Sequence, residues 1–185
     1  MLFRSGAGAT VYHNHSQILS TPILPPDILR SISGSEDYYR KNDKKVHEVM
    51  LKWEISEGQR IIYDNDGFVS FCPYVSKTPY ETRIFPKESS PRFEEISDGN
   101  LKSLAETLGV ILKKVDKLLD GSDFNFYIHT APIKKNRYID DSFYHWHMEI
   151  IPRLSVVGGL ELGTDVYVNV VNPDEAAKLL RETNS

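Results

Sequence analysis

The sequence predicts an α+β protein in which a long helix packs on an antiparallel β-sheet. Two observations predict this class. Short runs rich in β-branched and aromatic residues follow one another with turn residues between them, which is typical of strands. One stretch, residues 98–119, instead repeats its leucines at helical spacing. The predicted order from residue 60 onward is β-β-β-α-β-β-β-α, which favours an antiparallel sheet with a helix packed on it.

Length and composition limit the class of protein. The 185 residues suffice for one ordinary core, and 40% hydrophobic residues with a net charge of −4 fit a globular protein. The negative charge argues against a general nucleic-acid binder. The single cysteine, Cys72, excludes an internal disulfide and favours a reducing compartment. The sequence shows neither a signal-peptide core nor an apolar run of the roughly 20 residues that cross a bilayer, so we expect a cytoplasmic protein without a membrane span.

The N-terminal part is predicted to lead into a helical connector. Residues 5–10 are small and turn-prone. Residues 21–26 include three prolines, each of which keeps its predecessor extended. From residue 27 to about residue 57 the pattern is helical and highly charged, and most of its acidic side chains are expected to face solvent.

Three strands are predicted before the long helix. Runs 60–63 and 68–71 are strand-like and are joined by polar turn residues, and run 82–86 ends at its proline. Ser97 is a suitable N-cap for the helix that follows, and Gly121 is a suitable C-terminal stop. The apolar residues at helical spacing are expected to lie in the core; they are Leu101, Leu104, Ala105, Leu108, Leu112, Val115, Leu118 and Leu119.

Three more strands and a short helix are predicted after the long helix. The strands are expected at residues 124–129, 145–151 and 166–171. The final helix is expected over 174–180, directly after Pro173.

The strand over 145–151 carries the main candidate site. His145, His147 and Glu149 alternate with apolar residues, so the period of two places these polar side chains on one face. Strands seldom place two histidines and a glutamate on one face unless that face lines a site. A shorter copy of the pattern occurs at residues 13–19, and two stretches of this kind suggest a duplicated module.

These two stretches resemble a known family. Residues 145–151 resemble the His-φ-His-φ-His-φ-φ strand of the histidine triad (HIT) superfamily, with glutamate in place of the third histidine. Residues 13–19 resemble the glutamine variant in galactose-1-phosphate uridylyltransferases, which fuse two HIT-like halves. Further segments resemble the second half of those enzymes in the same order; they are 66–74, 79–87, 129–132 and 159–163.

The resemblance implies a HIT-like antiparallel sheet with a long packed helix. Residues 1–57 are expected to be the end of a first HIT-like half with a helical connector, and residues 58–185 a second HIT-like domain. In the family the first motif is preceded by most of a half-domain, which carries a cysteine-containing zinc site in many relatives. The chain is therefore expected to be a truncated protein or a reduced version.

The resemblance also implies a reaction. In these enzymes the central histidine of the glutamine-bearing motif, His15 here, attacks the α-phosphorus of a UDP-sugar. A uridylyl-histidine forms, sugar 1-phosphate leaves, and a second sugar 1-phosphate collects the UMP. Neutral imidazole is a suitable nucleophile near pH 7. Gln17 is expected to donate to a phosphoryl oxygen, and His13 to fix the geometry of His15 or to contribute to a metal site.

Two other functions remain open from the sequence. A nucleotide-sugar phosphorylase of the same superfamily would pass the nucleotidyl group to phosphate. A non-catalytic remnant would bind nucleotide or form dimers without a covalent adduct, and His13 and His15 would then be ordinary histidines. For the transferase, the resemblance implies UDP-sugar and sugar 1-phosphate as partners, a place in galactose metabolism, and self-association as a homodimer.

A second histidine group suits Zn²⁺ or Fe²⁺, because two histidines on one strand face and a third from a neighbouring strand can converge. The group is His129, His145 and His147. The resemblance implies a structural metal there in some relatives, whose fourth ligand, a glutamate, is replaced by Ser31 here. The site is expected to be completed by water, Glu36 or Glu149, or to be empty. The alternative is a hydrogen-bonded polar strand face without a metal.

Two further positions are candidates for substrate contacts. Glu161 matches a position that contacts sugar hydroxyls in relatives, although the glutamine that accompanies it there is Tyr167 here. A plain surface glutamate is the alternative. Arg153 is a candidate phosphate contact or a solvated residue at a strand end, and the basic loop 133–142 is expected to be solvated.

Overall fold

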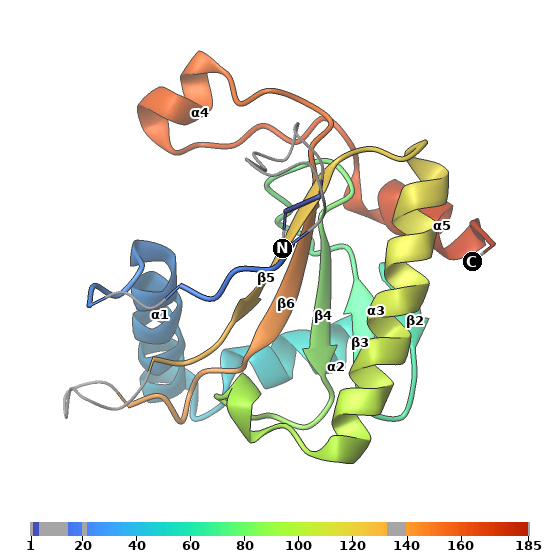
Figure 1. The fold of residues 1–185 in the computed structure, drawn as a ribbon. Helices are drawn as coiled ribbons and strands as arrows, with labels where there is room; N and C mark the ends of the chain where they lie inside the picture. Colours follow the sequence, from blue (N-terminus) through green and yellow to red (C-terminus); the bar gives the residue numbers. More distant parts are fainter. Residues whose placement is uncertain (1, 4–14, 20–21, 133–139, 185) are drawn as a thin grey trace.

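A computed structural model describes residues 2–3, 15–19, 22–132 and 140–184. These residues form a six-stranded antiparallel sheet with the order β1-β5-β6-β4-β3-β2 (Figure 1). The strands are β1 (Leu2–Phe3), β2 (Ile61–Asp64), β3 (Phe68–Phe71), β4 (Thr82–Pro86), β5 (Phe124–His129) and β6 (His147–Pro152). The helices are α1 (Pro26–Asn42), α2 (Val46–Glu57), the 3-10 turn η2 (Phe93–Glu95), α3 (Asp98–Leu118), α4 (Gly159–Thr164) and α5 (Pro173–Glu182). The predicted α+β class is confirmed.

Helices α3 and α5 pack on one face of the sheet. The Ser97 hydroxyl caps α3 by accepting a hydrogen bond from the backbone N–H of Asn100, at 3.2 Å. The main hydrophobic core lies between these helices and the sheet; its buried residues include Ile84, Leu104, Ile111, Trp146, Met148, Ile150 and Leu180. The helical spacing therefore predicted the core face, except that Leu101, in the first turn of α3, and Ala105 are exposed.

The turn between β2 and β3 is held by one side chain. Asn65 Oδ1 accepts hydrogen bonds from the backbone N–H groups of Gly67 and Phe68, at 3.1 and 2.9 Å. The Asn65 amide also donates to the Ser103 carbonyl, at 3.1 Å, and so ties the turn to α3. A Cβ atom on Gly67 would lie 3.3 Å from the Ser103 Cβ, so glycine permits this close approach of the helix.

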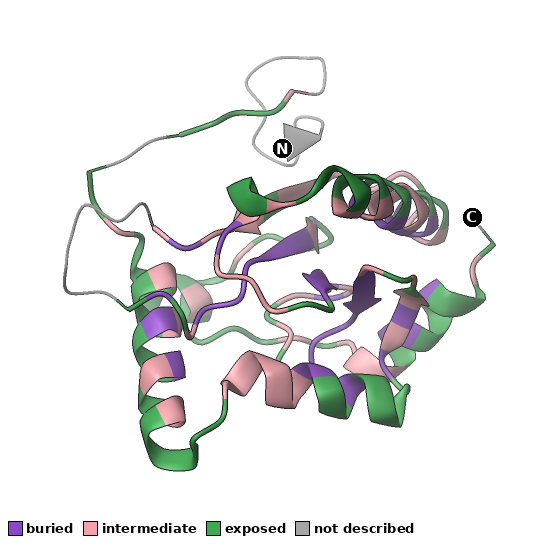
Figure 2. Cartoon of the chain, turned by 90° about the horizontal axis from the view of Figure 1, so that it is seen from below, coloured by how far each residue is buried: buried purple, intermediate pink, exposed green. Residues whose placement is uncertain are grey.

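Helix α2 lies on the opposite side of the sheet from α3, so helices cover both faces (Figure 2). Leu51 of α2 packs against three apolar side chains of β3 and β4; they are Val69, Phe71 and Phe85. Because both faces are covered, β3 and β4 are buried almost throughout their length. This second covered face is the one toward which His147 of β6 points.

The helical connector predicted over 27–57 consists of two helices. Helix α1 ends before Asp43, whose φ of 52° lies in the left-handed region, and α2 ends before Gly58, whose φ is 65°. Ile32 of α1 packs against Ala131 and Tyr144, which flank β5 and β6. Among the described helices, none combines the length and the apolar character needed to cross a membrane.

The strand predicted at 166–171 is wrong. The segment is irregular, and the short helix α4 precedes it. Three of its valines are exposed, with Val170 at 82%, whereas Val171 packs against the main core; the described sheet has no place for the segment in its strand order. The Asn169 side chain accepts a local hydrogen bond from the Val171 N–H at 2.9 Å and donates to the distant Thr78 carbonyl at 3.2 Å. High β-propensity without a strand partner does not make a strand.

Candidate functional site

Two neighbouring strands bring His129, His147 and Glu149 together. In the antiparallel pair β5–β6, His129 is the register partner of His147, and Tyr127 is the partner of Glu149. Met148, between the two β6 residues, points into the core beneath α3, so His147 and Glu149 point to the other face. The alternation in the sequence therefore predicted which side chains share this face.

The two imidazoles lie close to the same carboxylate. His129 Nε2 is 3.3 Å from one oxygen of Glu149, and His147 Nε2 is 3.7 Å from the other. The two rings stack, with centroids 4.8 Å apart, and the Phe85 ring stacks on the other side of His147 at 4.5 Å. The stack crosses β4, β6 and β5 and fixes the planes of both imidazoles.

A backbone contact sets the tautomer of His147. Its Nδ1 lies 3.1 Å from the carbonyl oxygen of His145, and a carbonyl can only accept, so Nδ1 donates. The lone pair of a neutral His147 ring is then on Nε2, which faces Glu149. Burial lowers the pKa of His147, although the contact with Glu149 opposes that effect. This is the arrangement that a histidine metal ligand requires.

Arg83 is the cation nearest to Glu149. Its guanidinium forms ion pairs at 2.9 Å with Glu149 Oε1 and at 2.9 Å with Glu81 Oε1. Burial raises the pKa of the Glu149 carboxyl, but the contacts with His129, His147 and Arg83 outweigh it and hold that pKa far below its ordinary value. Glu149 is therefore an anion at neutral pH.

His145 lies apart from this carboxylate and faces a histidine on α2. Its ring centroid is 5.3 Å from that of Phe85 and 6.3 Å from that of His47. Within the described part of the chain, neither ring nitrogen of His145 makes a hydrogen bond of good geometry. Burial lowers its pKa to about 3 and that of His47 to about 4, so both rings are neutral at pH 7.

Ligand atoms for a metal ion are present in this face. Nitrogen atoms of His129 and His147 and an oxygen of Glu149 all lie within 4.8 Å of one another. Two imidazoles and a carboxylate are a donor set that zinc and iron(II) accept, so the residues fit the group that the family implies. The sequence-based set shares His129 and His147 with this group, whereas His145 is not part of it. Glu149 was named only as a completing ligand.

The other ligands considered from the sequence lie elsewhere. Ser31 is on α1, where its carbonyl accepts the Ser35 hydroxyl at 2.7 Å. Glu36 pairs with Arg40 one turn along the same helix, at 2.5 Å. Neither of them joins the group formed by the two histidines and Glu149.

The N-terminal motif is described only in part. His15 is half-buried and Gln17 is exposed, and the Gln17 amide nitrogen lies 3.3 Å from His15 Nε2. An amide N–H donates and an imidazole lone pair accepts, so this contact leaves the proton of a neutral His15 ring on Nδ1. His13 lies outside the described residues.

The candidate substrate residues each make a contact within the chain. The Glu161 carboxylate accepts from the backbone N–H of Gly158 at 3.1 Å and so caps the start of α4. Arg153 is exposed, and its backbone N–H donates to the Asp123 carbonyl at 2.7 Å. Lys77 lies over the Tyr167 ring, at 5.5 Å from its centroid. Residues 133–139 of the basic loop lie outside the described residues.

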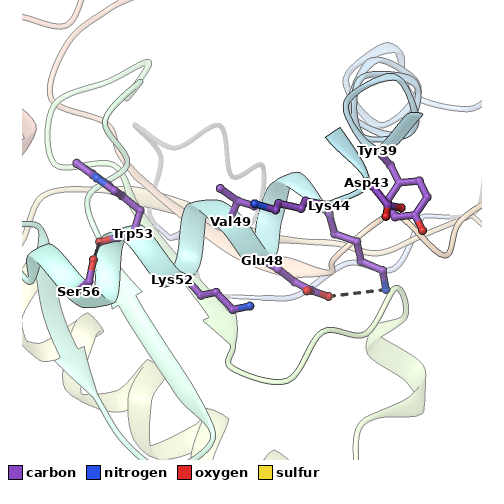
Figure 3. A pocket seen from close by; sticks show the side chains of 9 residues that line it. Tyr39, Asp43, Lys44, Glu48, Val49, Lys52, Trp53 and Ser56 are labelled. Carbon is purple, nitrogen blue, oxygen red and sulfur yellow. Dashed lines mark hydrogen bonds and ion pairs between the residues drawn. The ribbon is translucent and has the colours of Figure 1, made fainter. Parts of the chain in front are cut away.

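An open pocket is lined by the end of α1, the residues between α1 and α2, and one side of α2 (Figure 3). Its volume is about 720 Å³, and its charged lining residues are Asp43, Lys44, Lys45, Glu48 and Lys52. Lys45 and Glu48 pair across 3.8 Å. None of its lining residues belongs to the histidine group, so the pocket is separate from the site on the sheet.

Sequence reasoning missed Arg83 and His47. Arg83 lies beside Glu149 because β4 and β6 pair in a register that makes these two residues partners. His47 faces His145 because α2 packs over this face of the sheet. Neither segment shows a local pattern that marks these positions. The one available signal was the charge of Glu149 itself, because a carboxylate on a buried face requires a neutralising cation nearby.

Comparison with known sequences gives a consistent set of relatives. Residues 31–182 match the family described as galactose-1-phosphate uridyl transferase, C-terminal domain. The chain is 33% identical over 183 residues to an ADP-glucose phosphorylase from Arabidopsis thaliana and 33% identical over 184 residues to a galactose-1-phosphate uridylyltransferase from Thermotoga maritima. These alignments cover 97% and 95% of this chain but 50% and 56% of the relatives. The chain thus spans about half the length of the curated relatives that it matches.

Solved structures agree with this assignment. A GALT-like protein from Arabidopsis thaliana has a TM-score of 0.88 at 33% identity, covering 99% of this chain and 59% of that one. An ADP-glucose phosphorylase from the same plant, solved with bound ADP-glucose, has a TM-score of 0.88 at 32% identity, covering 100% and 58%. A HIT-like protein from Bartonella henselae, at 18% identity and a TM-score of 0.52 over 72% of this chain and 95% of that one, shares the fold. The chain has a HIT-like fold and belongs to the galactose-1-phosphate uridyl transferase C-terminal domain family.

Proposed function

We propose that this chain is a nucleotidyltransferase of the galactose-1-phosphate uridylyltransferase type that moves UMP between UDP-hexose and hexose 1-phosphate through His15. The observation that supports it is the contact between Gln17 and His15 Nε2 in a chain of this family. A nucleophilic imidazole needs its lone pair on the attacking nitrogen, and a nearby amide N–H can bind a phosphoryl oxygen without adding charge. The motif supplies both groups two residues apart.

The reaction has two steps. The lone pair of His15 Nε2 forms a bond to the α-phosphorus of the UDP-sugar, and the bond between that phosphorus and the bridging oxygen breaks. The sugar 1-phosphate leaves with the bond electrons. An oxygen of a second sugar 1-phosphate then attacks the same phosphorus, and the N–P bond breaks to restore the neutral ring. Gln17 donates to a phosphoryl oxygen in both steps, and His13 is proposed to hold the His15 ring.

The second candidate is a nucleotide-sugar phosphorylase, favoured by the similarity to an ADP-glucose phosphorylase. The first step is the same with ADP-glucose in place of UDP-glucose. In the second step inorganic phosphate attacks the nucleotidyl-histidine and leaves as part of the nucleoside diphosphate. The identities to the two kinds of relative are equal, so the acceptor must be measured.

The proposal also covers the domains, the assembly, the substrate contacts and the metal. Residues 1–57 are proposed to be the end of a first HIT-like half and residues 58–185 a second domain, with a homodimer as the working assembly. Glu161 is proposed to contact sugar hydroxyls and Arg153 a phosphate. Zinc or iron(II) at the group formed by His129, His147 and Glu149 would supply charge that holds β5 and β6 together. The histidine nitrogens would bind it as neutral ligands.

Intact-protein mass spectrometry after incubation with UDP-glucose or ADP-glucose, quenched at alkaline pH, tests the proposal. A mass gain of one UMP, absent from His15→Gln, is the expected result. A gain with ADP-glucose instead, discharged by inorganic phosphate and not by sugar 1-phosphate, would favour the phosphorylase. A folded protein that gains no mass from either substrate overturns both. That result would favour the remaining alternative, a non-catalytic remnant that binds nucleotide or forms dimers.

A further inference from the structure

Arg83 is built into the histidine–carboxylate group from two sides. Its guanidinium is 2.9 Å from Glu149 Oε1 and 2.9 Å from Glu81 Oε1, and its Nε donates to the same Glu81 oxygen at 3.1 Å. Glu81 is itself only 1% exposed, and its second oxygen accepts from the backbone N–H of Lys77 at 2.6 Å. Two nitrogens of the guanidinium bond one oxygen of a buried carboxylate that is itself held by the backbone, so the guanidinium has little freedom to move away.

The position of Arg83 matters because Glu149 Oε1 is shared. The same oxygen faces His147 Nε2 at 3.7 Å, and the Glu149 carboxylate is one of the three groups that a bound metal ion would use. Arg83 pairs with it from β4, the strand on the other side of β6 from His129. A guanidinium keeps its charge at any pH at which the protein is folded, so it cannot make room by losing a proton.

We propose that Arg83 is a resident cation that competes with a divalent metal ion for Glu149. In the natural chain the guanidinium neutralises the carboxylate, and a divalent ion bound by His129, His147 and Glu149 would lie close to a fixed positive charge. The group therefore binds such an ion weakly. Removal of the guanidinium leaves the three ligand side chains in place with an unneutralised carboxylate, which makes a tighter site.

The charge balance of the whole face leads to the same result. Around Arg83 the structure describes two carboxylates, Glu81 and Glu149, each of which forms an ion pair with the guanidinium. One guanidinium leaves a net charge of about −1 to bind a divalent ion, and its loss leaves about −2. The proposal concerns metal binding alone and does not depend on the transferase chemistry at His15.

Titration with Co²⁺, followed by visible absorption and by competition with a chelator, tests the proposal on the full chain. Arg83→Gln is expected to bind Co²⁺ about 10- to 100-fold more tightly than the natural chain, which is the scale on which outer-shell partners change metal affinity. Arg83→Lys, which keeps a positive charge, is the matched control and is expected to bind close to the natural value. Adding His129→Gln to Arg83→Gln is expected to abolish the gain.

Several results would overturn the proposal. Equal affinities of Arg83→Gln and the natural chain would do so, as would a gain that survives His129→Gln, because the metal would then lie elsewhere. Arg83→Met, which keeps the apolar stem, replaces Arg83→Gln if circular dichroism shows the latter unfolded. A natural chain that is isolated with one zinc or iron ion and keeps it through dialysis against EDTA refutes the competition without any variant.

Discussion

Burial of His47 predicts a loss of stability in mild acid. Its ring lies between α2 and the sheet, with the Phe85, Tyr144 and His147 rings at centroid distances of 6.0, 5.9 and 6.2 Å. Burial is the largest cause that lowers its pKa from 6.5 to about 4, and the charges of His147 and Arg83 add to it. The unfolded chain therefore binds a proton at His47 at a pH where the folded chain does not.

This difference in proton binding sets the sign and the size of the change in the free energy of unfolding with pH. Between pH 6.5 and about 4 the unfolded state holds the extra proton, so the free energy of unfolding falls as the pH falls. Each pH unit in that window costs about 1.4 kcal/mol for one such histidine, so a step from pH 6.5 to 5.0 removes about 2 kcal/mol. In His47→Gln this part of the pH dependence is expected to disappear, while the part that comes from His145 remains.

Urea unfolding at pH 6.5 and 5.0, analysed by linear extrapolation, measures the effect. The natural chain is expected to lose about 2 kcal/mol more than His47→Gln over this step. Lys52→Gln, at an exposed position of the same helix, is the control for a substitution in α2 and is expected to behave like the natural chain. Equal losses in the natural chain and in His47→Gln would refute the inference that the ring is buried and neutral.

Three further predictions concern the stability of the fold, namely the core contact of α3, its N-cap and the β2–β3 turn. Ile111→Ala, at a fully buried position of α3, is expected to lower the free energy of unfolding in urea by about 2 to 5 kcal/mol; a loss below about 1 kcal/mol would contradict the packing described. Ser97→Ala removes the N-cap of α3 and is expected to cost about 1 kcal/mol, seen as a lower thermal midpoint, with no change expected if the cap contributes nothing. Asn65→Ala removes the bonds that tie the β2–β3 turn to α3 and is expected to cost about 2 to 4 kcal/mol, whereas Asp66→Ala in the same turn is expected to stay within about 0.5 kcal/mol; similar costs for both would refute the role of the Asn65 side chain.

Features that depend on the spacing of residues within one helix or strand could be predicted from the sequence. Features that depend on a partner distant in the sequence could not. A period of two on β6 was enough to place His147 and Glu149 opposite Met148, and helical spacing was enough to find the core face of α3. The strand expected at 166–171 failed because its β-propensity is satisfied by no neighbouring strand in the described sheet.

The ligand group shows the same limit in more detail. His129 and His147 were predicted to converge, but the third member depended on the register of β5 against β6 and on which side chains reach the shared space. The register brings Glu149 to both imidazoles, while His145, just before β6 begins, is enclosed by α2. Arg83 could not be found from its own strand, because only the β4–β6 register makes it the partner of Glu149.

His145, two residues before β6, and the residues of β6 on the same face therefore divide that face of the sheet into a neutral part and a charged part. His145 belongs to the neutral part with His47, and Glu149 belongs to the charged part with Arg83. Substitutions at the two ends of this face should consequently have different effects. His145→Phe removes a titrating ring from an aromatic environment, so it is expected to reduce the loss of stability between pH 6.5 and 5.0 by about 2 kcal/mol.

Glu149→Gln, in the charged part of the face, is expected to change metal binding. It removes the carboxylate for which Arg83 and a metal ion compete, so Co²⁺ binding should be lost, and it should also be lost when Arg83→Gln is added. His145→Phe should leave the Co²⁺ affinity of Arg83→Gln unchanged, because His145 is not among the three converging ligands. A large fall in that affinity with His145→Phe would mean that the two parts form a single site, and the division argued from the geometry would be wrong.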